Sequence, residues 1–255
     1  MSFVQPGMFV LTSVVAMQRH VDYVRRGYHW YVTGFVPARK AERLRVKFVD
    51  RYYVEEHRNV RARRRARGEG AAVLLMYQPC SSAAEGVQSP GNGVGEMLVG
   101  WTLLLTEGEH PARALEKLKD ALDESQRLTL GPYQLIRRTR AGQVKPAWTW
   151  AMTKPEYSLW RDRVIRSARG DASHSPGRVL AELYRTPGFA GIRSQVGHVV
   201  SLYRLEWKRR RRGSDPFPRL PKLGYVQRLV NEFAATAAFE EGTPDQSIES
   251  SRQKI

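Results

Sequence analysis

The sequence has little of three features that would each indicate a particular class of protein. Its 255 residues include one cysteine, Cys80, which excludes an intramolecular disulfide framework and a zinc site built from several thiolates. No stretch approaches about 18 uninterrupted apolar residues, so we expect no transmembrane helix. Acidic residues are scarce, because 25 Asp and Glu stand against 42 Lys and Arg, a formal net charge of +17. This excess of positive charge predicts polyanionic partners.

Several motifs of common enzymes are also missing. The chain contains no GxxxxGK[ST], HExxH or GxSxG pattern and no Cys/His zinc spacing, which excludes a P-loop ATPase, a zinc protease and an α/β-hydrolase. We therefore expect no cofactor and no metal. Apolar residues make up 42% of the chain and charged residues 26%, values typical of a folded protein. We expect a cytoplasmic protein in a reducing compartment, with no membrane partner.

Two runs of basic residues stand out in the chain. The first contains Arg58, Arg61, Arg63, Arg64, Arg65 and Arg67, and the second contains Lys208, Arg209, Arg210, Arg211 and Arg212. A guanidinium group can contact a phosphate through two parallel hydrogen bonds, and neighbouring cations repel one another unless a polyanion offsets the repulsion. The runs therefore predict nucleic-acid binding. The alternative is a solvated arginine-rich surface without a ligand.

The pattern of apolar residues predicts an α+β fold. Apolar residues at 41, 44, 48 and 52 share one face of a helix after Pro37, and those at 115, 118 and 122 share one face of a second helix. Thr153-Lys154-Pro155-Glu156 is a capping box that begins a third helix. We predict strands over 28–36, 72–78, 97–106, 133–138 and 147–152. This order of elements favours a ferredoxin-like or RRM-like antiparallel sheet with helices, followed by a helical C-terminal region.

Four regions are expected along the chain. Residues 1–19 are apolar in part but interrupted by Pro6-Gly7 and without a basic segment before the apolar part, so we expect a poorly structured extension rather than a signal peptide. Residues 20–170 form the predicted sheet domain and residues 171–234 the helical region, with a last short helix over 223–233. Residues 235–255 are polar, and we expect a disordered tail. The Ser/Gly/Pro-rich segment 81–95 is predicted to be a flexible loop.

An RRM-like sheet binds single strands by stacking bases on aromatic residues of its central strands. Trp30 and Trp101 are the candidates here, because they lie on the first and third predicted strands. The alternative is that both rings belong to the core. The octamer and hexamer signatures of true RRM domains are absent, so this comparison is an analogy at the level of the fold.

Histidines suggest a nuclease as an alternative to a pure binding protein. His29, His57 and His110 are the candidate catalytic residues. His29 or His57 would be the general base of a metal-independent endoribonuclease of the CRISPR-RNA-processing type, and His110 would be a catalytic group on the loop after the third predicted strand. The glycine-rich loop expected near the C-terminus of such enzymes is missing. Replication initiators with a related sheet carry paired metal-binding histidines on a central strand. This chain has Gly100-Trp101-Thr102-Leu103 at the matching position and no histidine there, so as an initiator it would be a degenerate one. His110 also fits a residue that starts a helix.

Five segments resemble an uncharacterised family encoded on integrative conjugative elements and plasmids of proteobacteria. They are Tyr31-Val32-Thr33-Gly34 with Val36-Pro37 and Lys40, Trp101-Thr102-Leu103-Leu104-Leu105-Thr106, Pro146-Ala147-Trp148-Thr149-Trp150, Tyr184-Arg185-Thr186-Pro187-Gly188-Phe189-Ala190-Gly191 and Leu220-Pro221-Lys222-Leu223-Gly224-Tyr225-Val226. The resemblance covers residues 20 to 230. It implies a role in transfer, replication or maintenance of a mobile element, and it carries no catalytic motif.

The basic runs predict a nucleic-acid-binding protein, and the resemblance implies that it is an accessory protein of a mobile genetic element. DNA and RNA both stay open as ligands. A nuclease is one alternative, and a subunit whose helical C-terminus docks another protein of a nucleoprotein complex is a second.

Overall fold

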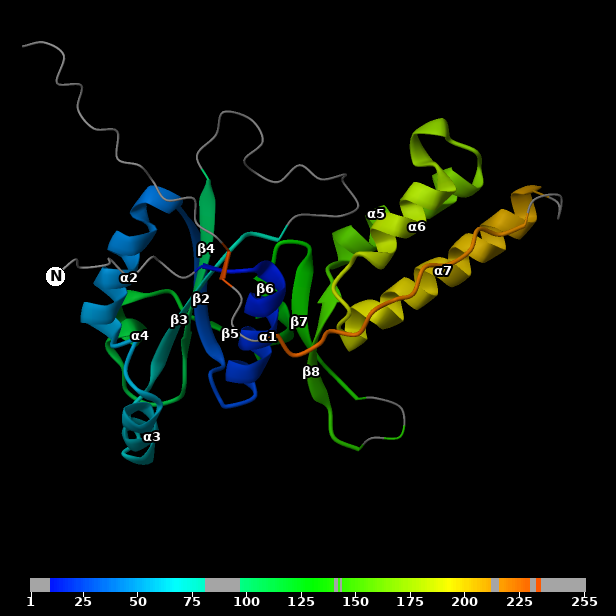
Figure 1. Ribbon diagram of the computed structural model, residues 1–255. Coiled ribbons are helices and arrows are strands. Elements are labelled where there is room, and N and C mark those ends of the chain that lie inside the picture. Colours follow the sequence, from blue (N-terminus) through cyan, green and yellow to red (C-terminus); the bar gives the residue numbers. More distant parts are fainter. Residues whose placement is uncertain are drawn as a thin grey trace, which may run out of the picture.

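The computed structural model describes residues 10–80, 97–139, 142, 144–211, 216–229 and 233–234 (Figure 1). Among these residues the α+β class expected from the sequence is confirmed. The helices are α1 (Ser13–Val24), α2 (Ala38–Tyr52), α3 (Arg58–Ala66), α4 (Pro111–Leu115), α5 (Lys154–Ala168), α6 (Pro176–Tyr184) and α7 (Ala190–Arg211). The strands are β1 (Val10–Leu11), β2 (Trp30–Pro37), β3 (Ala72–Tyr77), β4 (Leu98–Leu105), β5 (Lys119–Asp120), β6 (Thr129–Leu130), β7 (Tyr133–Arg138), β8 (Ala147–Met152) and β9 (Phe233–Ala234).

The larger sheet has the strand order β5-β2-β4-β3-β1-β9. Its centre is the antiparallel pair of β2 and β4, in which Trp30 lies opposite Leu105 and Pro37 opposite Leu98. Strand β2 is rich in aromatic and β-branched residues, which favour a pleated, half-buried backbone, and β4 is rich in leucine. Among the strands that the structure describes in this sheet, β1 and β3 run parallel and the other neighbouring pairs run antiparallel.

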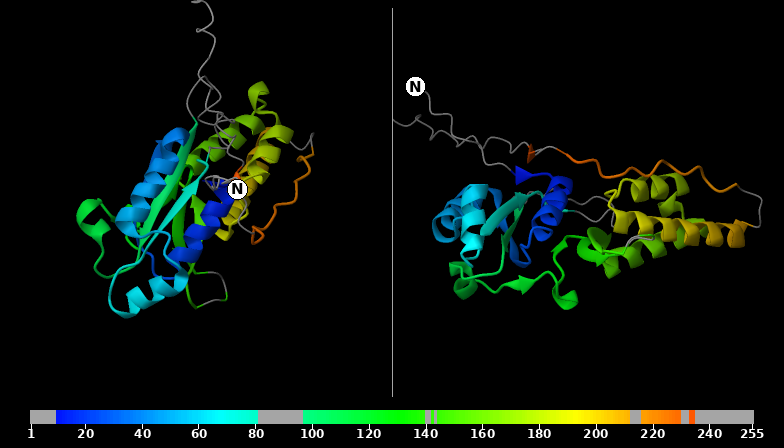
Figure 2. Two further views of the ribbon diagram at one scale, coloured as in Figure 1. Left: turned by 60° about the vertical axis from the view of Figure 1, so that its left-hand side comes forward. Right: turned by 90° about the horizontal axis from the view of Figure 1, so that it is seen from below.

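The two faces of this sheet are covered by different elements. Phe48 and Tyr52 of α2 and Ala112 of α4 pack on the face that carries Leu103 and Leu105. On the opposite face, residues of α1 and of the second sheet form the largest core cluster with Leu104 and other sheet residues. Successive strand residues alternate between these two faces. Seen from two further directions, the helices α2 and α4, the sheet, α1 and the second sheet follow one another as layers (Figure 2).

A second, three-stranded sheet has the order β6-β7-β8. Its strands β7 and β8 match the predicted ranges 133–138 and 147–152, but they do not join the first sheet. Helix α7 covers the free edge of β8, where the Gln195 side chain accepts a hydrogen bond from Met152 N (2.7 Å) and donates one to Met152 O (3.2 Å). These bonds satisfy backbone groups that an edge strand would otherwise leave unpaired.

The helix predicted through residues 115, 118 and 122 is wrong in its extent. Helix α4 ends at Leu115, because Glu116 is extended (φ −123°, ψ 145°) and the chain then pairs as β5 with β2. Leu118 alone of the three packs on the core, while Leu115 is 59% and Leu122 48% exposed. Pairing with the free edge of β2 satisfies backbone hydrogen bonds, and this outweighs the helical pattern of three leucines.

Two expected regional boundaries also differ from the structure. Residues 10–19 are not poorly structured, since α1 begins at Ser13 and its Val15, Ala16 and Met17 are fully buried. The boundary at 170 separates α5 from α6, although these helices pack on one another, and α5 also packs on α7. Residues 1–9, the predicted loop over 81–95 and the predicted tail over 235–255 lie outside the described residues.

The short helix predicted over 223–233 is absent from the described part of that range. Residues 216–229 instead form an extended segment, which we call the strap, and it runs alongside α7 (Figures 1 and 2). The backbone of the strap bonds to other elements: Val226 N donates to Gly188 O (3.3 Å), and Leu229 N donates to the Gln18 side chain (3.2 Å). These tertiary hydrogen bonds replace the local ones that a helix would make.

Candidate nucleic-acid interface

Helix α3 carries most of the first arginine run and buries none of its nine side chains. It contains five arginines and no acidic residue. Arg64 holds the helix to the body of the protein: its guanidinium bonds to Glu56 (2.7 Å) and Glu69 (3.0 Å) and lies 5.0 Å from the centre of the Tyr53 ring. Arg67, just beyond the helix, also bonds to Glu69 (2.7 Å). The helix is therefore fixed by charge and stacking rather than by a hydrophobic face.

A second basic segment lies against α3. Arg65 donates to Arg26 O (3.3 Å), and its guanidinium lies 6.0 Å from the centre of the Tyr28 ring. Burial raises the pKa of Tyr28, and the nearby Arg61 and Arg65 oppose that rise. Arg25 and Arg26 are exposed in the turn between α1 and β2. The sequence reasoning missed this pair, although the dipeptide before Gly27 was a visible signal.

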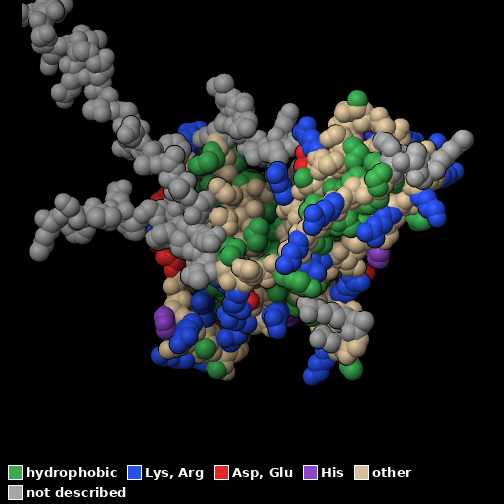
Figure 3. Space-filling view, turned by 45° about the vertical axis from the view of Figure 1, so that its right-hand side comes forward, with side chains coloured by type: hydrophobic (Ala, Val, Ile, Leu, Met, Phe, Trp, Pro, Cys, Tyr) green, Lys and Arg blue, Asp and Glu red, His purple; other side chains and the backbone are tan. Residues whose placement is uncertain are grey.

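The tip of the β7–β8 hairpin adds further positive charge at the same end of the molecule. Arg137, Arg138 and Lys145 are exposed there. The hairpin tip, α3 and the α1–β2 turn all lie at the lower end of the molecule in Figure 1. The space-filling view shows Lys and Arg side chains gathered at this lower end (Figure 3). We call these three segments the basic end.

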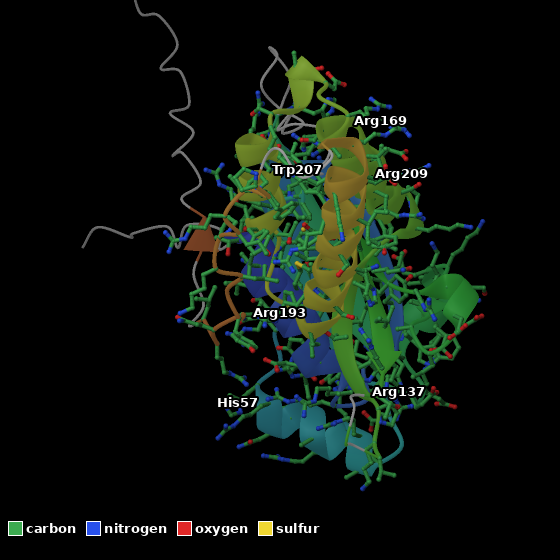
Figure 4. The ribbon with its side chains drawn as sticks, turned by 90° about the vertical axis from the view of Figure 1, so that its right-hand side faces the viewer. His57, Arg137, Arg169, Arg193, Trp207 and Arg209 are labelled. Carbon is green, nitrogen blue, oxygen red and sulfur yellow. The ribbon has the colours of Figure 1, made fainter. Side chains whose placement is uncertain are left out.

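The second basic run lies far from the first. Lys208, Arg209 and Arg210 are exposed near the C-terminus of α7, where Arg209 lies 3.8 Å from Glu206. The side chain of Arg211 and all of Arg212 are outside the described residues. Figure 4 shows His57 and Arg137 at one end of the molecule and Arg209 toward the other. The two runs therefore do not line one groove.

The two candidate stacking tryptophans lie on the face of the sheet that α2 and α4 cover. Trp101 is half-buried and packs edge-to-face on Phe48 of α2, with ring centres 5.3 Å apart. Trp30 donates from Nε1 to Glu107 (2.6 Å), and the Arg113 guanidinium lies 5.0 Å from its ring centre. Both rings thus have partners within the protein, and both are half-buried at the margin of the core.

The three candidate histidines all lie at ends of elements. His110 caps α4: its Nδ1 accepts from Ala112 N (3.2 Å), and a second hydrogen bond joins the ring to the backbone of Tyr52. Burial lowers the pKa of His110, in the direction that favours the neutral ring needed for this acceptor role. His57 caps α3 by accepting from Asn59 N (3.3 Å) and is exposed, and His29 precedes β2. The structure brings none of the three into a shared hydrogen bond among the described residues.

The chain was compared with known proteins at three levels. Neither the known protein families, nor the curated proteins, nor the solved structures give a match to the chain. Within the described ranges, no group of three or more His, Cys, Asp or Glu side chains is arranged to hold a metal ion. The helices in those ranges are also too short or too polar for any of them to span a bilayer.

Proposed function

We propose that the protein binds nucleic acid through its basic end, as an accessory protein of a mobile genetic element. The observation that carries this proposal is α3, a helix with five arginines and no buried side chain. A helix usually persists in a protein because one face packs on the core. Because α3 has no such face and is held through Arg64 and Arg65, its other guanidinium groups have no packing role, and phosphate binding gives them one.

Four of the five arginines of α3 divide into two groups by what they contact, and the fifth, Arg61, is half-buried near Tyr28. Arg64 and Arg65 join the helix to the rest of the protein. Arg58 and Arg63 are exposed, and neither makes an ion pair with any residue in the described part of the chain. The first group supplies rigidity, and the second is available for phosphate.

We further propose that residues 30–120 form a ferredoxin-like or RRM-like unit. In chain order its strands are β2, β3, β4 and β5, and their spatial order β5-β2-β4-β3 is antiparallel throughout. In a true RRM the face opposite the helices binds bases. Here α1 and the second sheet cover that face and bury Tyr31 and Leu104, which favours α3 rather than the sheet as the binding element.

The test measures salt-dependent binding to labelled single-stranded and double-stranded DNA and RNA. Each lost phosphate contact removes about 0.7 to 0.9 from the slope of log K against log salt concentration. The variant Arg58→Ala/Arg61→Ala/Arg63→Ala should therefore bind all sequences more weakly, with a slope flatter by about 2 to 3 units. The control variant Lys40→Ala/Arg43→Ala/Lys47→Ala removes the same charge from the exposed side of α2 and should keep the parent slope. Equal slopes in both variants would refute the proposal.

A metal-independent endoribonuclease is the second candidate function. The observation that favours it is His57, an exposed imidazole at the start of the arginine helix. The same preparations incubated with labelled RNA hairpins, with and without Mg²⁺, decide between binding and cleavage. Cleavage that is lost in His57→Ala would establish the enzyme.

A further inference from the structure

A cavity of about 640 Å³ opens where five segments of the chain meet. They are α1, β8, the loop before α7, the first turn of α7 and the strap. The lining residues are Val21, Trp148, Thr149, Gly188, Phe189, Ala190, Arg193, Ser194, Tyr225 and Val226. This volume lies within the range of small-molecule sites in proteins.

The walls of this cavity combine aromatic rings with a cation. Trp148, Phe189 and Tyr225 come from three different segments, and none of the ten lining residues is acidic. Tyr225 is 78% exposed, so its side chain is accessible from solvent beside the cavity. Exposed aromatic rings next to basic groups are the means by which proteins stack unpaired bases.

Arg193 is held in a fixed position at the cavity. Its Nη1 donates to Leu223 O (3.2 Å) and to Gly224 O (3.0 Å), and the guanidinium lies 3.4 Å from the centre of the Tyr225 ring. Both hydrogen bonds use one terminal nitrogen, so the edge formed by Nε and Nη2 is the one that can reach a phosphate. Ser194 adds a hydroxyl from the next position of α7.

The cavity is close to further positive charge. The guanidinium of Arg137, at the basic end, lies 6.0 Å from the centre of the Trp148 ring. Figure 4 shows Arg193 between His57 at the basic end and Trp207 on α7. A strand whose phosphates contact the basic end would therefore continue toward this cavity.

We infer that the cavity binds one nucleotide unit, with the base against the aromatic rings and the phosphate on Arg193. The inference rests on the proposed function, and it narrows the ligand to nucleic acid with an unpaired base. A nucleotide unit can come from a single strand or from a free nucleotide, and the two sources share this chemistry.

Photo-crosslinking of the unaltered protein tests the inference directly. A single-stranded oligonucleotide containing 5-iodouracil is irradiated with the protein, and the crosslinked peptides are identified by mass spectrometry. We expect crosslinks at Trp148, Phe189 or Tyr225. Free 5-iodouridine monophosphate forms the second arm, and stronger labelling of the same peptides by it than by the strand would identify the free nucleotide as the source. Crosslinks confined to other aromatic residues, such as Tyr53 beside α3, would overturn the inference.

Two variants separate this inference from the proposed function. Tyr225→Ala removes a stacking surface and should weaken binding of a single-stranded oligonucleotide about tenfold without changing the salt slope, whereas Tyr225→Phe should bind as the parent does. If Arg58→Ala/Arg61→Ala/Arg63→Ala weakens binding and Tyr225→Ala does not, the cavity does not bind a nucleotide and the proposed function stands. If neither variant weakens binding, both fail.

Discussion

Gly191 allows α7 to lie directly against the backbone of β8. A Cβ atom at this position would overlap the carbonyl oxygen of Trp150. Because the backbone cannot yield as a flexible side chain does, Gly191→Ala should lower the free energy of unfolding by about 2 kcal/mol. The measurement is urea unfolding followed by circular dichroism.

The same helix offers a matched control for this prediction. Gly197 is exposed on α7, and a Cβ atom there would meet nothing within 4 Å. Gly197→Ala should raise stability by about 0.5 to 1 kcal/mol, since alanine is the better helix former. Equal effects of the two substitutions would show that α7 does not lie against β8 as described.

His20 makes the stability of the fold depend on pH. The ring is fully buried between Tyr77 and Trp150, with Nδ1 2.6 Å from Ala16 O, and burial lowers its pKa from 6.5 to about 4. The unfolded chain binds a proton below pH 6.5 and the folded chain only near pH 4, so stability falls as pH falls through this window. The loss amounts to about 3 kcal/mol.

The variant His20→Leu isolates this contribution. The carboxylates titrate alike in both proteins, so the difference between their pH profiles reports His20 alone. Parent protein should lose stability between pH 6.5 and 5 faster than His20→Leu in chemical denaturation. Parallel profiles over that window would contradict the burial of a neutral ring.

At the scale of elements, α3 depends on Arg64 for its attachment. Arg64→Ala removes the ion pairs to Glu56 and Glu69 and the contact with Tyr53. The effect on global stability should be about 1 kcal/mol, because these pairs are partly solvated. The local effect should be larger, with faster hydrogen exchange of the α3 amides.

Arg63→Ala is the control for this element. Arg63 neighbours Arg64 but is exposed, and it forms no ion pair with the residues that the structure describes. Exchange of the α3 amides should be unchanged in this variant. If Arg63→Ala and Arg64→Ala accelerate exchange equally, α3 is not held through Arg64.

The elements differ in how well the sequence predicted them. Strands β7 and β8 match the predicted ranges residue for residue, and α2 follows the apolar spacing of 41, 44, 48 and 52. Helix α4 and the strap do not match, because their backbone groups bond to distant elements. Local patterns predict an element when its own hydrogen bonds and one apolar face suffice, and they fail where tertiary partners decide.

At the scale of the whole molecule, the two basic runs occupy opposite ends (Figures 1 and 4). Helix α7 has 22 residues, so its C-terminus lies about 33 Å from its start beside the cavity. Sites this far apart contribute independently to binding. The variants Arg58→Ala/Arg61→Ala/Arg63→Ala and Lys208→Ala/Arg209→Ala/Arg210→Ala should therefore lower the binding free energy of a long strand additively, to within about 0.5 kcal/mol.

Fluorescence anisotropy of a labelled strand with the two triple variants and their combination measures this additivity. A combined effect well below the sum would mean that both runs contact the same phosphates. That result would contradict the structure, in which the run on α3 and the run at the C-terminus of α7 lie at opposite ends of the molecule.

The sequence by itself determined the charge, the class of fold and most strands, because these depend on composition and on periodicities of two and 3.6 residues. It also identified the arginines of α3 as candidates. Only the tertiary structure placed Trp101 under α2, separated the two basic runs and brought Trp148, Phe189, Arg193 and Tyr225 to one cavity. The physical reason is that such contacts join residues distant in the chain, and no local pattern encodes which surfaces meet.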